Sequence, residues 1–588
     1  MILQALTSLY EALAQKGEIS KEGWSREKIS FALGIDENGD LLRITPLFET
    51  VDGPKGKTRE VPQKMTVPAA VKRTSGAAAN FLWDNSSYIL GVSLKKGEND
   101  AEREKRRNKD IKCFEACREL HHSMLDGMEY PAAKAVLNFL DKWEPQKAEE
   151  NNLVAQYAKE ILSGANMVFR FNGGYVHDDP QLASVWQKAN AKQKDNIGQC
   201  LITGELDAIP NTHPTIKGVQ GAQSSGAALV SFNASAFCSY NKEQNQNAPV
   251  GKYAAFAYTT ALNHLLADRK NVHRIGDAAV VCWAENADKQ YEDFAAEVFF
   301  GDNVDKSDEQ RLSALRTSLK LLADGLPCKE MDLDPDRKFY ILGLSPNAAR
   351  LAVRFFYCDS FGKIAGNIYK HHERLEIVRP SYDKFPILPL WKLLSATVNP
   401  NAKDKTPNAA MAGVVARAVF SGGRYPASLL ECTFLRIKAE RSITRERAAI
   451  IKAYYLRNPN EKCPKEVLTV SLNENSKNIP YTLGRLFSVY EEIQQAANPG
   501  INTTIKDRYF GSAAAMPATV FPILSNLAQK HLRKLSDAQR VYLDKKVMTL
   551  KSVLGEQYPA HMSLPEQGSF DLGYYHQTQA RYTKKEDK

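Results

Sequence analysis

The chain has 588 residues, of which 78 are Lys or Arg and 68 are Asp or Glu, so its formal net charge at pH 7 is +10. This length predicts several hydrophobic cores, and the modest surplus of cations excludes a histone-like surface while allowing local basic tracks. The chain has no run of 18 apolar residues, no basic segment at its start and no paired framework among its nine cysteines, so we expect no membrane span, no export and a reducing cytoplasm.

The first hundred residues are predicted to be β-rich. Apolar residues at helical spacing predict a helix over about 2–15. The segments 30–36 and 41–47 resemble strands on either side of Asn38-Gly39, the strongest short hairpin signal. The segment 51–64 is predicted to be an exposed basic loop, and 65–70 and 80–94 are predicted to be strands.

The middle of the chain alternates between the two periodicities. The charged run 95–112 leads into a helix that continues to about 127, and further helices are predicted near 131–144 and 151–164. Strand-like segments at 167–173, 197–205, 278–285 and 338–345 alternate with helices, which indicates a mixed α/β arrangement.

From about residue 385 the pattern is mostly helical. Helices are predicted at 481–497, 513–533 and 536–554, and the tail 555–588 shows little periodicity. The sequence therefore predicts an α+β multidomain protein in four parts: a β-rich region (1–100), a mixed α/β core (101–380), a helical connecting region (381–466) and an all-α bundle with its tail (467–588).

Residues 198–258 carry the most informative pattern. Gly218, Gly221 and Gly226 allow a backbone to come close to another surface, and many Asn and Gln side chains offer the donor and acceptor pair that matches an adenine edge. The glycine spacing matches neither G-x-G-x-x-G nor G-x-x-x-x-G-K-[ST], which excludes these nucleotide cradles. The alternative is an ordered internal loop lying over the alanine-rich helix 251–269.

This motif, together with the segments 80–92, 254–266 and 275–285, resembles the large subunit of the type I-C (Dvulg subtype) CRISPR surveillance complex, Cascade. The resemblance covers nearly the whole chain. It implies a subunit that recognises the protospacer-adjacent motif (PAM) in duplex DNA, helps to start unwinding and R-loop formation, and supports recruitment of a helicase-nuclease. The C-terminal part resembles the Cascade small subunit, which in such families is sometimes also made separately.

The resemblance also implies partners. These are the CRISPR guide RNA, target duplex DNA, the backbone subunits, the subunit that holds the 5′ handle of the guide, and the small subunits. It implies no membrane and no cofactor.

Two sets of residues are candidates for DNA binding, because amides read base edges, cations bind phosphates and tyrosine stacks on unpaired bases. The PAM candidates are Lys64, Lys72, Arg73, Thr74, Lys217, Gln220, Gln223, Asn233, Tyr240, Gln244 and Asn245. The candidates for a track along the DNA backbone are Arg441, Arg445, Arg447, Lys452, Arg485, Lys506, Arg508, Arg533 and Lys534. For any single member of the track, the alternative is an ordinary solvated helix surface.

The sequence offers weak catalytic alternatives. Cys113, Cys117 and His121 share one helix face, but successive members are about 6 Å apart along the helix, so a single zinc does not fit and a buried stripe is expected. The stretches 371–373 and 332–336 lack the spacing of the H-E-x-x-H and EF-hand motifs. We therefore expect no metal site and no enzymatic activity.

Two rival functions stay open at this stage. One is a stand-alone cysteine-dependent hydrolase that uses Cys200, His213 and Cys238. The other is a structural scaffold that contacts protein only.

Overall fold

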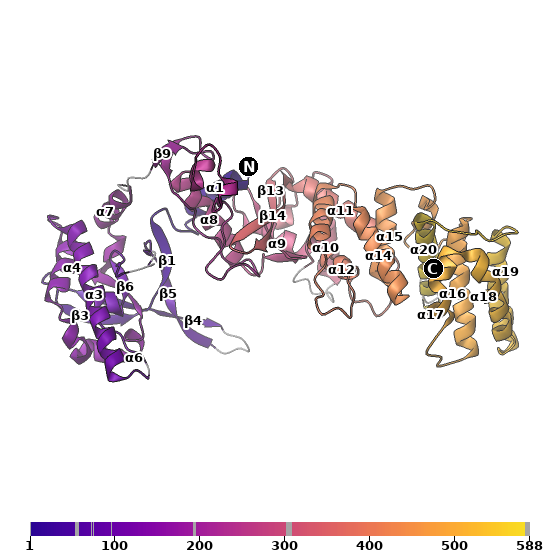
Figure 1. The fold of residues 1–588 in the computed structure, drawn as a ribbon, viewed down its shortest axis with the longest axis horizontal. Coiled ribbons are helices and arrows are strands. Elements are labelled where there is room, and N and C mark those ends of the chain that lie inside the picture. Colours follow the sequence, from indigo (N-terminus) through magenta and orange to yellow (C-terminus); the bar gives the residue numbers. More distant parts are fainter. Residues whose placement is uncertain are drawn as a thin grey trace. The chain divides into compact units, whose positions relative to one another are not determined.

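The computed structural model describes residues 2–52, 58–71, 73, 76–95, 97–191, 196–301 and 309–582. The chain divides into two units, which are treated separately below. Figure 1 shows the ribbon with its elements labelled, coloured from indigo at the N-terminus to yellow at the C-terminus. One unit, the N-terminal unit, contains Tyr10–His213 and Phe232–Ala261; the other, the C-terminal unit, contains the first nine residues, Pro214–Ser231 and Leu262–Lys588. The glycine- and amide-rich motif is therefore shared between both units.

The N-terminal unit contains three β-sheets, with helices around them. Its elements are β1 (Trp24–Ile29), β2 (Phe31–Ile35), β3 (Leu41–Pro46), β4 (Phe48–Asp52), β5 (Thr58–Pro68), β6 (Trp83–Asn85), α2 (Ser86–Ile89), α3 (Asp100–Leu125), α4 (Pro131–Lys142), α5 (Asn152–Ala155), α6 (Ala158–Ile161), β7 (Asn166–Phe171), β8 (Gly174–Tyr175), α7 (Pro180–Ala191), β9 (Asn196–Gln199) and β10 (Leu206–Ile209). Two helices, α1 (Ile2–Gln15) and α8 (Lys252–Ala267), cross the boundary between the units.

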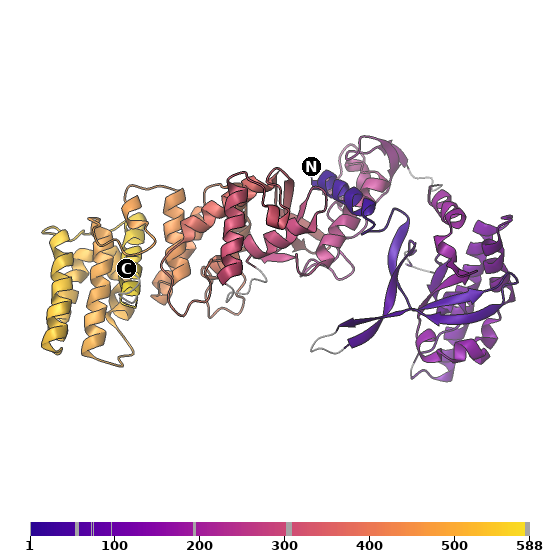
Figure 2. The same cartoon turned by 180° about the vertical axis from the view of Figure 1, so that it is seen from behind.

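Two sheets organise the N-terminal unit. In one, the strand order is β3-β2-β7-β6, with β8 paired to β7; β2 and β7 are parallel and the other pairs are antiparallel. In the other, the long strand β5 pairs with β1 along its second half and with β4 along its first half. The β4–β5 part of this ribbon extends away from α3 and α4 (Figure 2).

His121 links α3 to the segment around Leu82 in the core of this unit. It lies on α3 with Cys113 and Cys117, and all three side chains are buried, as the sequence predicted. One ring nitrogen, Nε2, accepts from the backbone N–H of Leu82, a residue with a left-handed φ of 62°, and Nδ1 donates to the carbonyl of Cys117. Burial lowers the pKa of His121 to about 4, so the ring is neutral at pH 7.

The C-terminal unit starts with an antiparallel sheet and continues as helices. Its elements are β11 (His273–Ile275), β12 (Ala278–Ala284), α9 (Lys289–Val298), α10 (Glu309–Ala323), β13 (Lys338–Asn347), β14 (Arg350–Ser360), α11 (Phe361–Leu375), α12 (Leu390–Ser395), α13 (Ala409–Ser421), α14 (Ala427–Glu440), α15 (Arg445–Arg457), α16 (Ile479–Ala497), α17 (Ile505–Ala515), α18 (Pro517–Leu532), α19 (Asp537–Val553) and α20 (Leu564–Ala580). The sheet has the order β11-β12-β13-β14.

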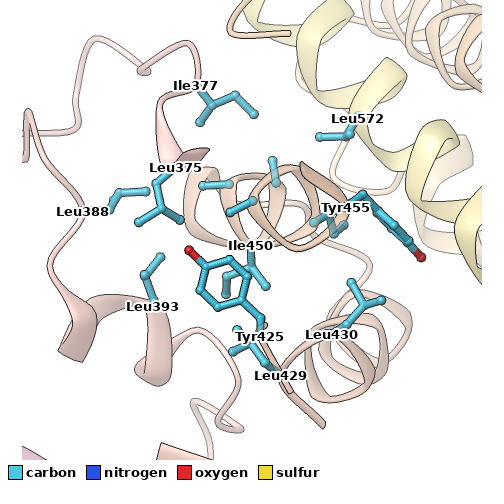
Figure 3. Close-up of a cluster of buried hydrophobic side chains, with 14 of the residues drawn as sticks. Leu375, Ile377, Leu388, Leu393, Tyr425, Leu429, Leu430, Ile450, Tyr455 and Leu572 are labelled. Atoms are coloured by element: carbon cyan, nitrogen blue, oxygen red, sulfur yellow. The ribbon is translucent and has the colours of Figure 1, made fainter. Parts of the chain in front are cut away.

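One hydrophobic cluster runs through the C-terminal unit from Ile275 to Tyr575. Figure 3 shows its centre, where Ile450 and Tyr455 of α15 lie between the segment after α11 and the buried helix α20. The boundary predicted at residue 467 falls inside this cluster, and the four-part division of the chain stays a prediction.

The α+β fold class is confirmed, with strands concentrated in the first part and helices from α16 to α20 at the end. The opening helix, the hairpin at Asn38-Gly39 and the helix after the charged run are confirmed. In the described part of the chain, no helix is long and apolar enough to cross a lipid bilayer.

Several predictions of local structure were wrong. The segment 80–94 holds only the short strand β6 before α2, and residues 58–64 of the expected loop belong to β5, whereas 53–57 lie outside the described residues. The helix expected over 513–533 is divided at Pro517, because proline at the first position starts a new helix. The tail contains α20, which is largely buried.

Two further segments differ from their predictions in extent. The helix expected over 151–164 consists of the short helices α5 and α6, and the strand expected over 197–205 ends at Gln199.

Candidate nucleic-acid interface

A strip of cations covers one face of the β1–β5 ribbon. In its antiparallel register Arg26 lies opposite Thr66 and Lys28 lies opposite Lys64. Residues directly opposite each other share a face, as do residues two apart on one strand, so these four side chains lie together. All four are exposed. We call this set, Arg26, Lys28, Lys64 and Thr66, the basic ribbon face.

Two positive charges, those of Lys28 and Lys64, lie directly opposite each other in the basic ribbon face. Like charges directly opposite on neighbouring strands destabilise a sheet by a few tenths of a kcal/mol to about 1 kcal/mol. No carboxylate in the described part of the chain forms an ion pair with Arg26, Lys28 or Lys64. This arrangement favours an external anion, and a two-stranded ribbon has the width to enter the major groove of DNA.

Arg73 is held by the protein itself. Its guanidinium forms an ion pair with the buried carboxylate of Asp84, donates through Nε to the carbonyl of Ala78 at 2.7 Å and lies 4.0 Å from the ring centre of Tyr88. Burial raises the pKa of Asp84, whereas the N–H of Asn80 and the charge of Arg73 act to lower it. Arg73 therefore holds together parts of the protein, and the guanidinium predicted to read the PAM is engaged by Asp84, Ala78 and Tyr88. The neighbouring candidates Lys72 and Thr74 lie outside the described residues.

The part of the motif that belongs to the C-terminal unit presents exposed polar side chains. Lys217, Gln220 and Gln223 are exposed, and Gln220 accepts from Arg274 at 3.0 Å. The loop is rigid at its base, because Gly226 has a φ of 104° and a Cβ atom there would lie 2.6 Å from the hydroxyl oxygen of Thr215. The predicted close approach of backbones thus occurs inside the protein.

In the part of the motif that belongs to the N-terminal unit, one candidate side chain is buried and three are at least partly exposed. Asn245 is buried, because its side chain bonds to His213 and to the carbonyl of Val250. Asn233 is exposed and Gln244 is half-buried. Tyr240 is 94% exposed, with a left-handed φ of 54°. Its ring is accessible for stacking.

The arrangement needed for a cysteine hydrolase is not formed by His213. Its Nδ1 lies 2.6 Å from the hydroxyl of Tyr258 and its Nε2 lies 2.8 Å from Oδ1 of Asn245, so both nitrogens have partners other than a thiol. Burial acts to raise the pKa of Cys200, but N–H groups, that of Gly251 first, bring it below its usual value. No pattern in the sequence indicates this lowered pKa, and a low pKa without a base in contact makes no catalytic pair.

Comparison with known proteins identifies the family. The family model described as CRISPR-associated protein (Cas_Csd1) matches residues 6–582. The chain belongs to the Cas_Csd1 family. No curated protein matches it significantly.

Four cations of the predicted backbone track lie in the interior of this Cas_Csd1 chain, where the prediction placed them on a surface. They are Arg445, Arg447, Lys452 and Arg485, each 7% exposed or less. Each donates to backbone carbonyls; Lys452, for example, binds the carbonyls of Glu373 and Arg374 at the end of α11. Burial lowers the pKa of Lys452 to about 8. These groups satisfy helix ends and loops.

The other five members of the track remain accessible in the Cas_Csd1 chain. Arg441, Arg508, Arg533 and Lys534 are exposed and Lys506 is partly exposed. Lys506 lies 5.3 Å from the ring centre of Tyr574, and Arg508 lies 5.3 Å from that of Tyr509. Sequence reasoning missed Arg26 and Lys28, although their alternation with Glu27 in a strand-like segment could have indicated a common face.

Replacing Arg445 by methionine is expected to lower the stability of the chain by about 3 kcal/mol, because the change removes one partner of a buried ion pair. Arg445 binds Asp383 at 2.9 Å, and both side chains are 7% exposed. Arg441→Met is the matched control: Arg441 is exposed, so the change is expected to alter stability by less than about 0.5 kcal/mol. Urea unfolding measures both. An Arg445→Met protein that unfolds like wild type but binds DNA poorly would contradict the interior role.

Proposed function

We propose that this Cas_Csd1 chain is the large subunit of a type I-C CRISPR RNA-guided surveillance complex and recognises the PAM in duplex DNA. The observation that carries the proposal is the basic ribbon face, in which Lys28 and Lys64 lie opposite each other and form no ion pair with a carboxylate of the described residues. Membership of the Cas_Csd1 family supports a role in CRISPR defence.

The proposed reading of DNA divides between cations and neutral side chains. Arg26, Lys28 and Lys64 bind phosphates or guanine edges, and Thr66 contacts a base or its methyl group. The exposed amides of Gln223 and Asn233 are suited to adenine edges. Specificity for a short duplex signal then comes from a few contacts, whereas the guide RNA reads the rest of the target by base pairing.

The later steps use other accessible groups. Tyr240 offers a ring on which an unpaired base can stack while the duplex opens. Arg508, Arg533 and Lys534 bind phosphates of a separated strand during R-loop formation. The partners in this proposal are the guide RNA, the backbone and small subunits, the 5′-handle subunit and a recruited helicase-nuclease, in the cytoplasm.

We further propose that the chain has no catalytic activity and needs no cofactor. The contacts of His213 with Tyr258 and Asn245 support this proposal, because they occupy both ring nitrogens of the histidine that the cysteine hydrolase would use. Bond breaking is assigned to the recruited helicase-nuclease.

The experiment is equilibrium binding of the assembled complex, with its guide, to a duplex that carries the PAM and to one in which the PAM is mutated. At about 50 and 200 mM salt, both affinities are expected to fall with salt, and the PAM duplex is expected to bind at least about tenfold more tightly at each concentration. Equal affinity for both duplexes would contradict PAM recognition and favour the protein-only scaffold.

A further inference from the structure

A large cavity of about 1250 Å³ lies in the C-terminal unit between α10, α11 and the segment 376–388. Small-molecule sites are usually about 300–1,000 Å³ in volume, so this cavity is large enough for a nucleotide. Nothing in the proposed reading of the PAM uses it.

Four exposed cations line this cavity from two sides. Arg316 and Lys320 are one helical turn apart on α10, so they present their charges together. Arg379 and Lys384 come from the segment 376–388. No ion pair is recorded between any of these four and a carboxylate of the described residues. We call Arg316, Lys320, Arg379 and Lys384 the cavity cations.

Three carboxylates also line the cavity, those of Glu373, Glu376 and Asp383. Asp383 is paired with Arg445 at 2.9 Å and with Lys392 at 3.2 Å. Glu373 and Glu376 act on the buried Lys452: its burial lowers its pKa, and their charges oppose that shift. The four cavity cations outnumber the three lining carboxylates, and one of these, Asp383, is already paired with cations of the protein.

The wall of the cavity is fixed by Arg445. Its guanidinium donates to the carbonyl oxygens of Phe385 and Pro386 as well as to Asp383. Arg445 lines the cavity and is 7% exposed, and its Nε has no hydrogen-bond partner among the described residues. A buried donor without a partner is uncommon in proteins and is satisfied when a ligand or water supplies an acceptor.

The cavity also has an apolar floor. Leu375, Ile377 and Leu388 line it and belong to the hydrophobic cluster of this unit, and Figure 3 places them beside α15. Burial lowers the pKa of His372, another lining residue, to about 4, so its ring is neutral at pH 7. An apolar floor next to a group of cations is suited to a ligand with a flat ring and phosphates.

We propose that this cavity binds a nucleotide, with its phosphates on the cavity cations and its base against the apolar floor. The nucleotide is either a free molecule or one unit of a nucleic-acid strand, since both present the same chemistry. The site binds without breaking a bond, and it does not depend on PAM recognition by the basic ribbon face.

The test measures fluorescence anisotropy of the full chain with two probes, N-methylanthraniloyl-ATP and a fluorescein-labelled twelve-residue oligodeoxythymidine. The variant Arg316→Glu with Lys320→Glu is expected to weaken binding of the bound probe by at least about tenfold. The matched control is Lys370→Glu with Lys403→Glu, which makes the same change of charge at exposed lysines outside the cavity lining. The control is expected to stay within about twofold of wild type.

The two probes separate the two sources of the ligand. Binding of the ATP probe identifies a free nucleotide, and binding of the oligonucleotide alone identifies a strand. A second pair, Arg379→Glu with Lys384→Glu, gives the same result if the first pair disturbs folding, because its residues lie on a separate segment. The proposal is overturned if neither probe binds wild type, or if the control pair weakens binding as much as the cavity pairs do.

Discussion

Replacing Gly484 by alanine is expected to destabilise the C-terminal bundle by about 3 kcal/mol or more, the large end of what overpacking costs. A Cβ atom at this position would lie 1.9 Å from the carbonyl oxygen of Phe570 and 2.8 Å from the backbone nitrogen of Tyr574. These are backbone atoms of α20, so no side-chain rotation relieves the clash. The reverse holds at Gly573, where a Cβ atom would lie 2.1 Å from the carbonyl oxygen of Tyr481. Relief requires α16 and α20 to move apart, which would open the core between them.

Gly511→Ala is the matched control for this prediction. Gly511 lies on α17, and a Cβ atom there would meet nothing within 4 Å. Alanine is favoured over glycine in a helix by up to about 1 kcal/mol, so the control is expected to be as stable as wild type or slightly more stable. Denaturant unfolding followed by circular dichroism compares the three proteins. A Gly484→Ala protein as stable as wild type would contradict the close crossing of α16 and α20.

The double variant Lys28→Glu with Lys64→Glu is expected to weaken DNA binding by the assembled complex on the order of a hundredfold at about 0.1 M salt. The estimate follows from counterion release, which gives roughly tenfold for each phosphate contact at this salt concentration. The slope of log affinity against log salt is expected to become shallower by about 2, one unit for each lost contact. Folding is expected to be unaffected, because the two new carboxylates again lie opposite each other and are exposed.

The matched control for the basic ribbon face is Lys159→Glu with Lys188→Glu. Both lysines are exposed on α6 and α7 of the same unit, so net charge changes equally. We expect the control to change affinity by less than about threefold, because neither lysine belongs to the basic ribbon face and exposed charges without a direct contact are screened by salt. An equal loss in both double variants would show a general effect of charge and would contradict a specific contact by the ribbon.

The sequence predicted the parts of this fold whose local signals agree with their surroundings. The Asn38-Gly39 hairpin is one example: Gly39 has a φ of 82°, and a Cβ atom there would lie 2.3 Å from the backbone nitrogen of Phe139. Local turn chemistry and tertiary packing both require glycine at this position. The buried face of α3 was predictable for the same reason, since Cys113, Cys117 and His121 recur at helical spacing.

The helix α20 was missed because burial on all sides removes the periodicity that marks an amphipathic helix. Polar side chains such as Asp571 and His576 are buried within it alongside apolar ones. Burial raises the pKa of Asp571 well above its usual value. Hydrophobic periodicity marks a helix that has one face in water and one face in the core. Most of α20 is buried, so this signal is weak.

The sequence indicated which types of residue could bind DNA, but it did not show which of these residues are exposed or lie side by side. Arg445 and Arg485 have the composition of a phosphate track, yet both are buried and bind carbonyl oxygens. No local pattern separates an arginine that binds a helix end from one that faces solvent. The strip of Arg26, Lys28 and Lys64 needed the register of β1 against β5, which brings together residues almost forty positions apart.

The most direct test of the central claim is photocrosslinking from the basic ribbon face. A p-benzoylphenylalanine at Thr66, which is exposed and lies opposite Arg26, is placed in the complete complex with guide RNA and a PAM-bearing duplex. After irradiation, we predict a crosslink to nucleotides of the PAM, and none when the PAM is mutated. A crosslink that falls only on protein, or on DNA without regard to the PAM, would contradict PAM recognition by the basic ribbon face.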